Sequence, residues 1–532
     1  MLHLLSFAFI GANAFALSVG PRATLTLTND VVAPDGFERS AIVVNGGHPG
    51  PLIQANKGDA YTINVVNRLT DSTMQRVSSI HWHGLSQRGT NWADGGSGVN
   101  QCPISPNHSF EYQFSGRKDQ AGTFWYHSHY SIQYCDGLRG PLVIYDPNDP
   151  FKNLYDVDDE STVITLTDWY HTPFPSVTGP PTSDSTLING KGRYPGGPNV
   201  DLSVINVERG KRYRFRLVAL TCENSHLFGI DGHQLLVIET GGESTVPTLV
   251  DKITLLAGQR YSFVLDANQA VDNYWIRGLP RSGVPSLKAG YEGGLNSAIL
   301  RYQGAPITEP QTTDNENAAL LDEAQLVPTR NPFAPGRPTS GGADFNVTVN
   351  FELDLTTGSP HFKLNGKIYQ PPTVPILLQI ISGARKAEEL LPEGNIYFVP
   401  RNKVVEVTVP GGIPGAPHPM HLHGHHFSVV KSAGKHNQVN YLTPVRRDTT
   451  ASPVEVDDNT TIRFTTDSPG PWIFHCHFNK HQSIGMAVVF VADIDEVAEK
   501  NPTPDAWNDL CPIYQSLSES ETVVEIVPMV KH

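Results

Sequence analysis

The most constraining stretch of this sequence lies near its C-terminus, where His475-Cys476-His477 precedes His481 and Met486. The flanking residues, 472–474 and 487–490, are apolar and β-prone, which predicts that the histidines and cysteine end a buried strand. Because side chains alternate along a strand, His475 and His477 project to one face and Cys476 to the other. A thiolate, two imidazoles and a weak thioether are the ligands of a blue-copper electron-transfer site. Cys476, His481 and Met486 are three of those four, so one histidine must come from elsewhere.

Three further motifs carry histidines at alternating positions: His81-Trp82-His83-Gly84, His127-Ser128-His129 and His418-Pro419-Met420-His421-Leu422-His423. On an extended segment, an H-x-H pair places two imidazoles on one face. A single pair is more often an ordinary surface feature. Two such pairs in one β-rich region, each flanked by aromatic residues, favour metal binding.

Counting the ligands predicts how the metals are distributed. The blue site takes Cys476, His481 and His418, with Met486 as the axial candidate. Eight histidines remain in four H-x-H pairs, which are His81 and His83, His127 and His129, His421 and His423, and His475 and His477. Imidazole suits copper, and eight ligands distribute as three, three and two over a trinuclear cluster. Two pairs come from each end of the chain, so the cluster is expected at a domain interface, joined to the blue site through Cys476.

Composition predicts an all-β protein with several domains. A chain of 532 residues is too long for one core and suggests roughly three or four domains. Charged residues are 17% of the total, and 47 glycines and 42 prolines separate short β-branched runs. The net charge of −14 argues against nucleic acid and anionic membrane surfaces as partners.

The N-terminus resembles an export signal, because the apolar run Leu4–Ala16 ends in Ala14-Phe15-Ala16. We expect a signal peptide over residues 1–16 and a secreted, soluble mature protein, with possible glycan sites at Asn107, Asn346 and Asn459. Turn-rich segments predict domains over 17–149, 150–317 and 318–532. The middle domain contains no H-x-H pair, so we expect it to be structural and to contribute to a substrate pocket.

The five cysteines fit an exported protein. If Cys476 binds copper, then Cys102, Cys135, Cys222 and Cys511 remain for two disulfides. Four cysteines allow three pairings, and spacing does not choose among them.

Taken together, the four motifs resemble those of the fungal laccases, from about residue 22 to residue 513. The resemblance implies three consecutive cupredoxin-like domains, each a Greek-key β-barrel or sandwich, and four copper ions in a monomer. It implies a type 2 copper on His81 and His421, and disulfides pairing Cys102 with Cys511 and Cys135 with Cys222. The two type 3 coppers would take two sets of histidines, His83, His127 and His477 in one and His129, His423 and His475 in the other.

The same resemblance implies roles for two carboxylates. Glu223 matches an acid beside the blue site that accepts the proton of a phenol as the electron leaves through His481. Asp94, in Trp92-Ala93-Asp94-Gly95, matches an acid near the type 2 copper that helps to deliver protons to reduced oxygen. Without the resemblance, both would be interpreted as solvated surface acids.

Several residues depart from the family's pattern. Met486 stands where fungal laccases usually have Leu or Phe, which predicts a low to medium potential because a thioether donates to copper. Phe478-Asn479-Lys480 and Gln482-Ser483-Ile484 also differ from the usual sequence around His481.

The leading interpretation is a laccase that oxidises phenols and aromatic amines with dioxygen. The alternatives are a ferroxidase-like metallo-oxidase, which would need acids around the blue site, and a copper-binding protein without turnover.

Overall fold

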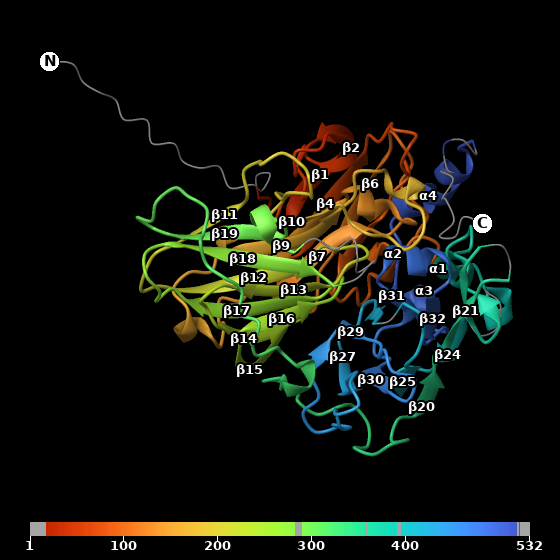
Figure 1. The fold of residues 1–532 in the computed structure, drawn as a ribbon. Helices are drawn as coiled ribbons and strands as arrows, with labels where there is room; N and C mark the ends of the chain where they lie inside the picture. Colours follow the sequence, from red (N-terminus) through yellow and green to blue (C-terminus); the bar gives the residue numbers. More distant parts are fainter. Residues whose placement is uncertain are drawn as a thin grey trace.

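The computed structural model describes residues 18–281, 290–356, 359–390, 395–415, 417–518 and Glu521. The chain forms three consecutive units, each built on two main sheets, which we call the first (residues 22–145), second (163–302) and third (345–492) β-units (Figure 1). They are open sandwiches rather than closed barrels, which selects one of the two forms expected from the sequence. The expected signal peptide and most of residues 517–532 lie outside the described residues.

The first β-unit contains two four-stranded sheets, ordered β2-β1-β4-β6 and β3-β8-β7-β5. Its strands are β1 (Arg22–Val32), β2 (Arg39–Val44), β3 (Ile53–Asn56), β4 (Tyr61–Asn67), β5 (Ile80–His83), β6 (Ser109–Phe114), β7 (Gly122–Ser128) and β8 (Arg139–Tyr145).

The second β-unit contains a six-stranded sheet, β10-β9-β12-β17-β14-β15, and a five-stranded sheet, β11-β19-β18-β13-β16. Its strands are β9 (Val163–Trp169), β10 (Ser185–Ile188), β11 (Val204–Val207), β12 (Arg212–Ala219), β13 (His226–Ile230), β14 (Leu235–Thr240), β15 (Glu243–Val250), β16 (Lys252–Leu255), β17 (Arg260–Asp266), β18 (Asn273–Pro280) and β19 (Ser297–Tyr302).

The third β-unit contains two five-stranded sheets, β20-β25-β30-β27-β28 and β24-β32-β31-β26-β29, and a small sheet, β21-β22-β23. Its strands are β20 (Phe345–Thr348), β21 (Phe351–Asp354), β22 (His361–Leu364), β23 (Lys367–Ile368), β24 (Ile396–Val399), β25 (Val404–Pro410), β26 (Pro419–Leu422), β27 (Phe427–Lys431), β28 (Arg446–Arg447), β29 (Thr449–Ala451), β30 (Asn459–Thr465), β31 (Gly470–Cys476) and β32 (Ala487–Ala492).

Four short helices accompany the third β-unit: α1 (Ile376–Ile381), α2 (Asn479–Ser483), α3 (Val497–Lys500) and α4 (Asp505–Gln515). None of the described helices has the length and apolar character required to cross a membrane.

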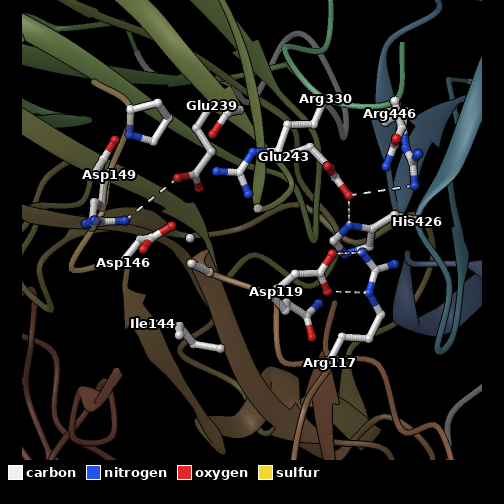
Figure 2. Close-up of a pocket in the computed structure, with 18 of the residues that line it drawn as sticks. Arg117, Asp119, Ile144, Asp146, Asp149, Glu239, Glu243, Arg330, His426 and Arg446 are labelled. Carbon is white, nitrogen blue, oxygen red and sulfur yellow. Dashed lines mark hydrogen bonds and ion pairs between the residues drawn. The ribbon is translucent and has the colours of Figure 1, made fainter. Parts of the chain in front are cut away.

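The three β-units meet around a small, strongly charged cavity of about 70 Å³ (Figure 2). Its charges are paired: Arg117 contacts Asp119 at 3.0 Å, and Arg214 contacts Glu239 at 2.5 Å. The first pair is largely exposed and lies within the first unit, and the second is buried within the second unit. A contact between units comes from Glu243 of the second unit, which lies 2.7 Å from His426 Nδ1 of the third.

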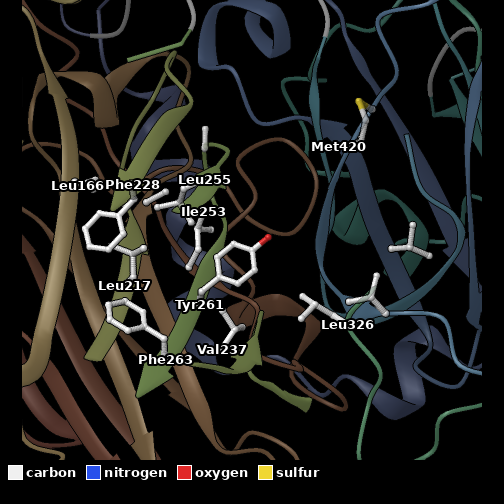
Figure 3. Packing of buried hydrophobic residues seen from close by; sticks show 14 of the residues in the cluster. Leu166, Leu217, Phe228, Val237, Ile253, Leu255, Tyr261, Phe263, Leu326 and Met420 are labelled. Atoms are coloured by element: carbon white, nitrogen blue, oxygen red, sulfur yellow. The ribbon is translucent and has the colours of Figure 1, made fainter. Parts of the chain in front are cut away.

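Burial patterns explain why these segments form strands. In β4, alternate residues are buried, as expected for a strand with one face on the core. In β7 every residue is buried, because both faces of that strand are covered. The largest apolar cluster joins the second and third β-units, from Phe228 and Phe263 to Met420 (Figure 3). The blue-copper candidate Cys476 lies in this same cluster.

Candidate metal centre

Strand register brings the H-x-H pairs together. In the first β-unit, β5 pairs with β7 so that His81 lies opposite His127. In the third, β26 pairs with β31 so that His421 lies opposite His475 and Met420 opposite Cys476. Directly opposite residues on antiparallel strands have neighbouring side chains. Two pairs of strands therefore supply the eight histidines, and their rings gather where the first and third β-units meet.

His81 and His421 face each other across this interface, with their Nε2 atoms 3.4 Å apart. The Nδ1–H of His81 donates to the Asp94 carbonyl oxygen at 2.8 Å, and that of His421 donates to the Asp448 carbonyl oxygen at 2.8 Å. A carbonyl oxygen only accepts, so in neutral rings both Nε2 atoms present lone pairs to each other. Two lone pairs at this distance call for a cation between them.

The other histidines of the cluster follow the same pattern. His475 Nδ1 donates to the Cys476 carbonyl oxygen at 2.9 Å, and its Nε2 lies 3.1 Å from His423 Nε2. His83 Nδ1 lies 3.2 Å from His477 Nε2. The Nε2 atoms of His127 and His129 are buried without a hydrogen-bond partner. Three facing pairs and two unpartnered nitrogens are a donor set that fits three copper ions.

Burial keeps these rings neutral. Burial, together with the neighbouring imidazoles, lowers the pKa of His81, His129 and His477 to about 3. The pKa values of the remaining histidines of the cluster are also well below 6.5, again chiefly because of burial. A histidine binds metal in its neutral form, so the cluster is in the state that copper requires.

A buried ion pair between Asp448 and Arg260 contacts the His83 ring at Nε2, the nitrogen that does not face His477. Asp448 Oδ1 lies 3.2 Å from His83 Nε2, and Arg260 donates to both Asp448 oxygens, at 2.7 and 2.6 Å. Burial alone would raise the pKa of Asp448, but Arg260 holds it below its usual range. A carboxylate behind a ligand histidine fixes the ring and its tautomer. Sequence reasoning missed both residues, because no local motif marks them and the contact spans 365 residues.

Asp94 lies behind two histidines of the cluster. Its Oδ2 is 2.7 Å from His423 Nδ1, while its carbonyl oxygen accepts from His81. Burial raises the pKa of its carboxyl group well above 3.8, and Oδ1 has no hydrogen-bond partner. The group therefore tends to hold a proton next to the cluster.

The blue-copper candidates form a separate, compact group. The Sγ of Cys476 lies 3.6 Å from His418 Nδ1 and 3.7 Å from His481 Nδ1, and those two nitrogens are 3.1 Å apart. Met486 is buried, and its backbone bonds to Cys476 and to His481. Burial raises the pKa of the Cys476 thiol, so its thiolate depends on a bound metal.

His481 differs from the other candidate ligands because its ring is partly exposed, whereas the other nine histidines and Cys476 are buried. Its helix, α2, begins where Glu223 Oε1 accepts from the Lys480 N–H at 2.6 Å. Burial raises the pKa of Glu223 to about 8, despite the hydrogen bond from the Lys480 backbone. His481 is therefore the candidate ligand most open to solvent, and its helix lies beside a buried carboxyl group with a raised pKa.

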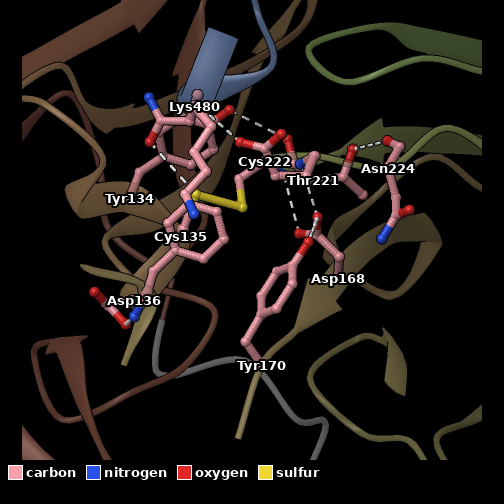
Figure 4. Close-up of a disulfide and its surroundings, with 12 residues drawn as sticks. Tyr134, Cys135, Asp136, Asp168, Tyr170, Thr221, Cys222, Asn224 and Lys480 are labelled. Atoms are coloured by element: carbon pink, nitrogen blue, oxygen red, sulfur yellow. Dashed lines mark hydrogen bonds between the residues drawn. A yellow bond between two sulfur atoms is a disulfide. The ribbon is translucent and has the colours of Figure 1, made fainter. Parts of the chain in front are cut away.

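Two disulfides tie the units together. Cys135 pairs with Cys222 behind the blue group, and Figure 4 shows this bond among Tyr134, Asp168 and Lys480. Cys102 pairs with Cys511 across 409 residues and joins the first β-unit to α4. Cys476 is the free cysteine of the described residues.

A cavity of about 310 Å³ adjoins the histidine cluster on the side of His129. Tyr130, Tyr369, Tyr514 and a run of prolines line it, together with Gln482 and Ser483. The cavity offers small molecules a space next to His129, whose Nε2 is unpartnered.

Comparisons with known proteins agree with this geometry. Models described as multicopper oxidase match residues 26–149, 160–305 and 369–496. The chain is 54% identical to Laccase-1 of Trametes villosa over 526 residues, which are 97% of this chain and 99% of that relative. It is 52% identical to Laccase-2 of Pleurotus ostreatus over 531 residues, covering 98% and 96%.

Solved structures of similar fold include the laccase of Botrytis aclada, with a TM-score of 0.80 and 29% identity over 96% of this chain and 95% of that one. They also include Fet3p, described as a multicopper oxidase that functions in iron import. Its TM-score is 0.81 at 25% identity, covering 96% and 98%.

Proposed function

Because this chain belongs to the fungal laccases of the multicopper oxidase family, we propose that it oxidises phenols and aromatic amines and reduces dioxygen to water. It is a copper oxidoreductase whose cofactor is four copper ions. The copper ions supply one-electron oxidation at the type 1 position and dioxygen reduction at the other three positions.

We assign the type 1 copper to His418, Cys476 and His481, which would hold it together with Met486 as a weak fourth ligand. The type 2 copper is assigned to His81 and His421. The type 3 coppers are assigned to two sets of histidines, His83, His127 and His477 in one and His129, His423 and His475 in the other. Each of the three close nitrogen pairs, 3.1 to 3.4 Å apart, then lies within the ligand set of a single copper.

The observation that carries this assignment is the His81–His421 pair. Their outer nitrogens both donate to carbonyl oxygens, so their inner nitrogens present lone pairs to each other at 3.4 Å. Buried polar atoms are normally satisfied, and here a shared cation is the partner that the chemistry requires.

At the donor site, the exposed edge of His481 receives the electron from a bound phenol. Loss of an electron makes a phenol strongly acidic, and Glu223 is the carboxylate that takes the proton. Cys476 is covalently linked to His475 and His477, so the chain itself provides a short path from the donor site to the cluster.

At the cluster, Asp94 supplies a proton, since burial raises the pKa of its carboxyl group. The cavity beside His129 gives dioxygen access and water an exit. The second β-unit supplies Glu223 to the donor site.

We also propose that the protein is secreted, consistent with the apolar run ending at Ala16, and acts as a monomer.

A ferroxidase would need accessible acids to bind Fe(II) beside His481. Glu223 is 5% exposed, and one of its oxygens already accepts from the Lys480 N–H, so it is a poor cation ligand. Steady-state oxygen uptake by the copper-loaded protein, with a dimethoxyphenol and Fe(II) compared side by side, tests the proposal. Faster uptake with the phenol supports a laccase, whereas faster uptake with Fe(II) would replace it by a ferroxidase.

A further inference from the structure

His426 follows the His421-Leu422-His423 ligand motif but lies outside the metal centre, and its ring contacts all three β-units. It belongs to the third unit, just before β27. Its Nδ1 lies 2.7 Å from Glu243 Oε1 in the second unit (Figure 2). Its Nε2 lies 2.9 Å from the Gly84 carbonyl oxygen in the first unit. The side chain is only 7% exposed.

Both partners of His426 are acceptors. The carbonyl oxygen of Gly84 only accepts, so Nε2 carries a hydrogen, and a carboxylate likewise accepts from Nδ1. Burial alone would raise the pKa of Glu243, but the hydrogen bond and charge of His426, with Arg446 and Arg117, lower it. Glu243 is therefore an ionised acceptor, and both ring nitrogens of His426 lie within hydrogen-bond distance of an acceptor oxygen.

Charged side chains surround the His426 ring. Glu243 and Asp448 face it, with Asp448 Oδ2 at 3.7 Å from Nε2. Arg260 neutralises Asp448 from the other side, and Arg446 lies 3.9 Å from Glu243. The Phe124 ring stacks near the imidazole at 6.4 Å.

Two of the residues that His426 contacts, Gly84 and Asp448, adjoin His83 of the trinuclear centre. Gly84 immediately follows His83, and its backbone has φ +86, a conformation that favours glycine. A Cβ on Gly84 would lie 2.7 Å from Asp448 Oδ2. Asp448 in turn contacts His83 Nε2. His426 therefore contacts both Gly84, the residue after His83, and Asp448, the carboxylate that contacts the His83 ring.

We propose that His426 is a positioning residue for the trinuclear site, whose ring links Gly84 to Glu243 and so fixes His83. The proposal rests on the copper assignment given above. It predicts that loss of His426 affects the type 3 copper that includes His83, while the blue site of Cys476, on the opposite strand face, is unaffected.

The test uses the copper-loaded full chain and the variants His426→Gln and Glu243→Gln. Copper per protein, the visible band of the blue site and the near-ultraviolet band of the type 3 pair are measured for each. We expect His426→Gln to lose type 3 absorption and copper while the blue band is unchanged. Glu243→Gln should give a smaller loss of the same kind, and the double variant should lose no more than His426→Gln alone.

His436→Gln is the matched control, because His436 pairs with Asp322 at 3.0 Å on the surface, with its side chain 75% exposed. Equal loss of the blue and type 3 bands in both variants would reduce His426 to a general stabilising role and overturn the proposal. Unchanged spectra and copper content in His426→Gln would overturn it as well. If that variant does not fold, Glu243→Gln decides the question by the same two bands. The proposed function itself is judged separately, on the wild-type protein.

Discussion

Glu223 of the second β-unit accepts a 2.6 Å hydrogen bond from the backbone N–H of Lys480, the residue immediately before His481. The same carboxyl group thus bonds to the first turn of the helix that carries the partly exposed His481, where we propose that it accepts the proton of a phenol. Burial raises its pKa to about 8. A protonated carboxyl cannot accept the proton of a phenol, so the ionised fraction should limit turnover below that pH.

Replacing Glu223 by Gln should therefore separate two kinds of electron donor. Phenol oxidation should fall by about 100-fold in kcat/KM, the lower end of what general base catalysis contributes. Oxidation of ferrocyanide, which releases no proton, should change little. Equal losses for both donors would show that Glu223 acts only by holding α2.

The same variant should change the pH dependence of stability. The folded chain holds a proton on Glu223 up to about pH 8, whereas the unfolded chain releases it near 4.5. The folded state therefore binds more protons between these values, and this stabilisation is complete below pH 4.5 and lost as pH rises through 8. Thermal unfolding of Glu223→Gln should show a shallower decline over this window. A decline parallel to that of the wild type would contradict the assigned pKa.

Met486 is buried beside the blue group, and its backbone N–H donates to the His481 carbonyl oxygen at 3.0 Å. Met486→Leu should raise the type 1 reduction potential, because the variant loses a weak thioether donor. The two side chains have similar volumes, so the stability cost should stay below about 1.5 kcal/mol. A redox titration of the blue band measures the change. An unaltered potential would mean that Met486 is not the axial ligand.

Asp448→Asn should weaken copper binding at the cluster by roughly 10–100-fold, the usual effect of removing a carboxylate behind a ligand histidine. The variant should also lose about 3–5 kcal/mol of stability, because Arg260 becomes a buried charge without its partner. Glu406→Gln serves as the control, since Glu406 pairs with buried Arg463 at 2.7 Å outside the copper centre. It should lower stability and leave the copper content intact. Loss of copper in both variants would indicate unfolding instead.

Copper removal should make the protein sensitive to acid. Burial lowers the pKa of His81, His129 and His477 to about 3, so the folded metal-free chain resists protonation that the unfolded chain accepts near 6.5. Their contribution to stability is present above pH 6.5 and is lost as pH falls towards 3. Thermal midpoints of the chelator-treated protein should fall across this range. A flat profile would show that the rings are already protonated or exposed.

The sequence was sufficient to predict the candidate ligands because strand alternation converts H-x-H spacing into geometry. His81 and His83, or His475 and Cys476, are placed by local pattern alone. The residues that contact these ligands from other parts of the chain cannot be predicted in this way. Asp448, Arg260 and Tyr134, whose hydroxyl lies 3.1 Å from His477 Nδ1, reach the cluster only through tertiary packing. No local pattern marks His426 either, since its contacts with Gly84 and Glu243 depend on how three β-units meet. Local pattern cannot encode such contacts.

The central claim is that four copper ions occupy two groups of side chains at the positions assigned here. Anomalous diffraction from crystals of the copper-loaded protein, recorded at the copper absorption edge, tests it most directly. We predict one peak among Cys476, His418 and His481, and three peaks within the cluster, each inside one of the assigned ligand sets, including one between His81 and His421. A fully loaded protein without a peak between His81 and His421, or with copper bound elsewhere, would contradict the account.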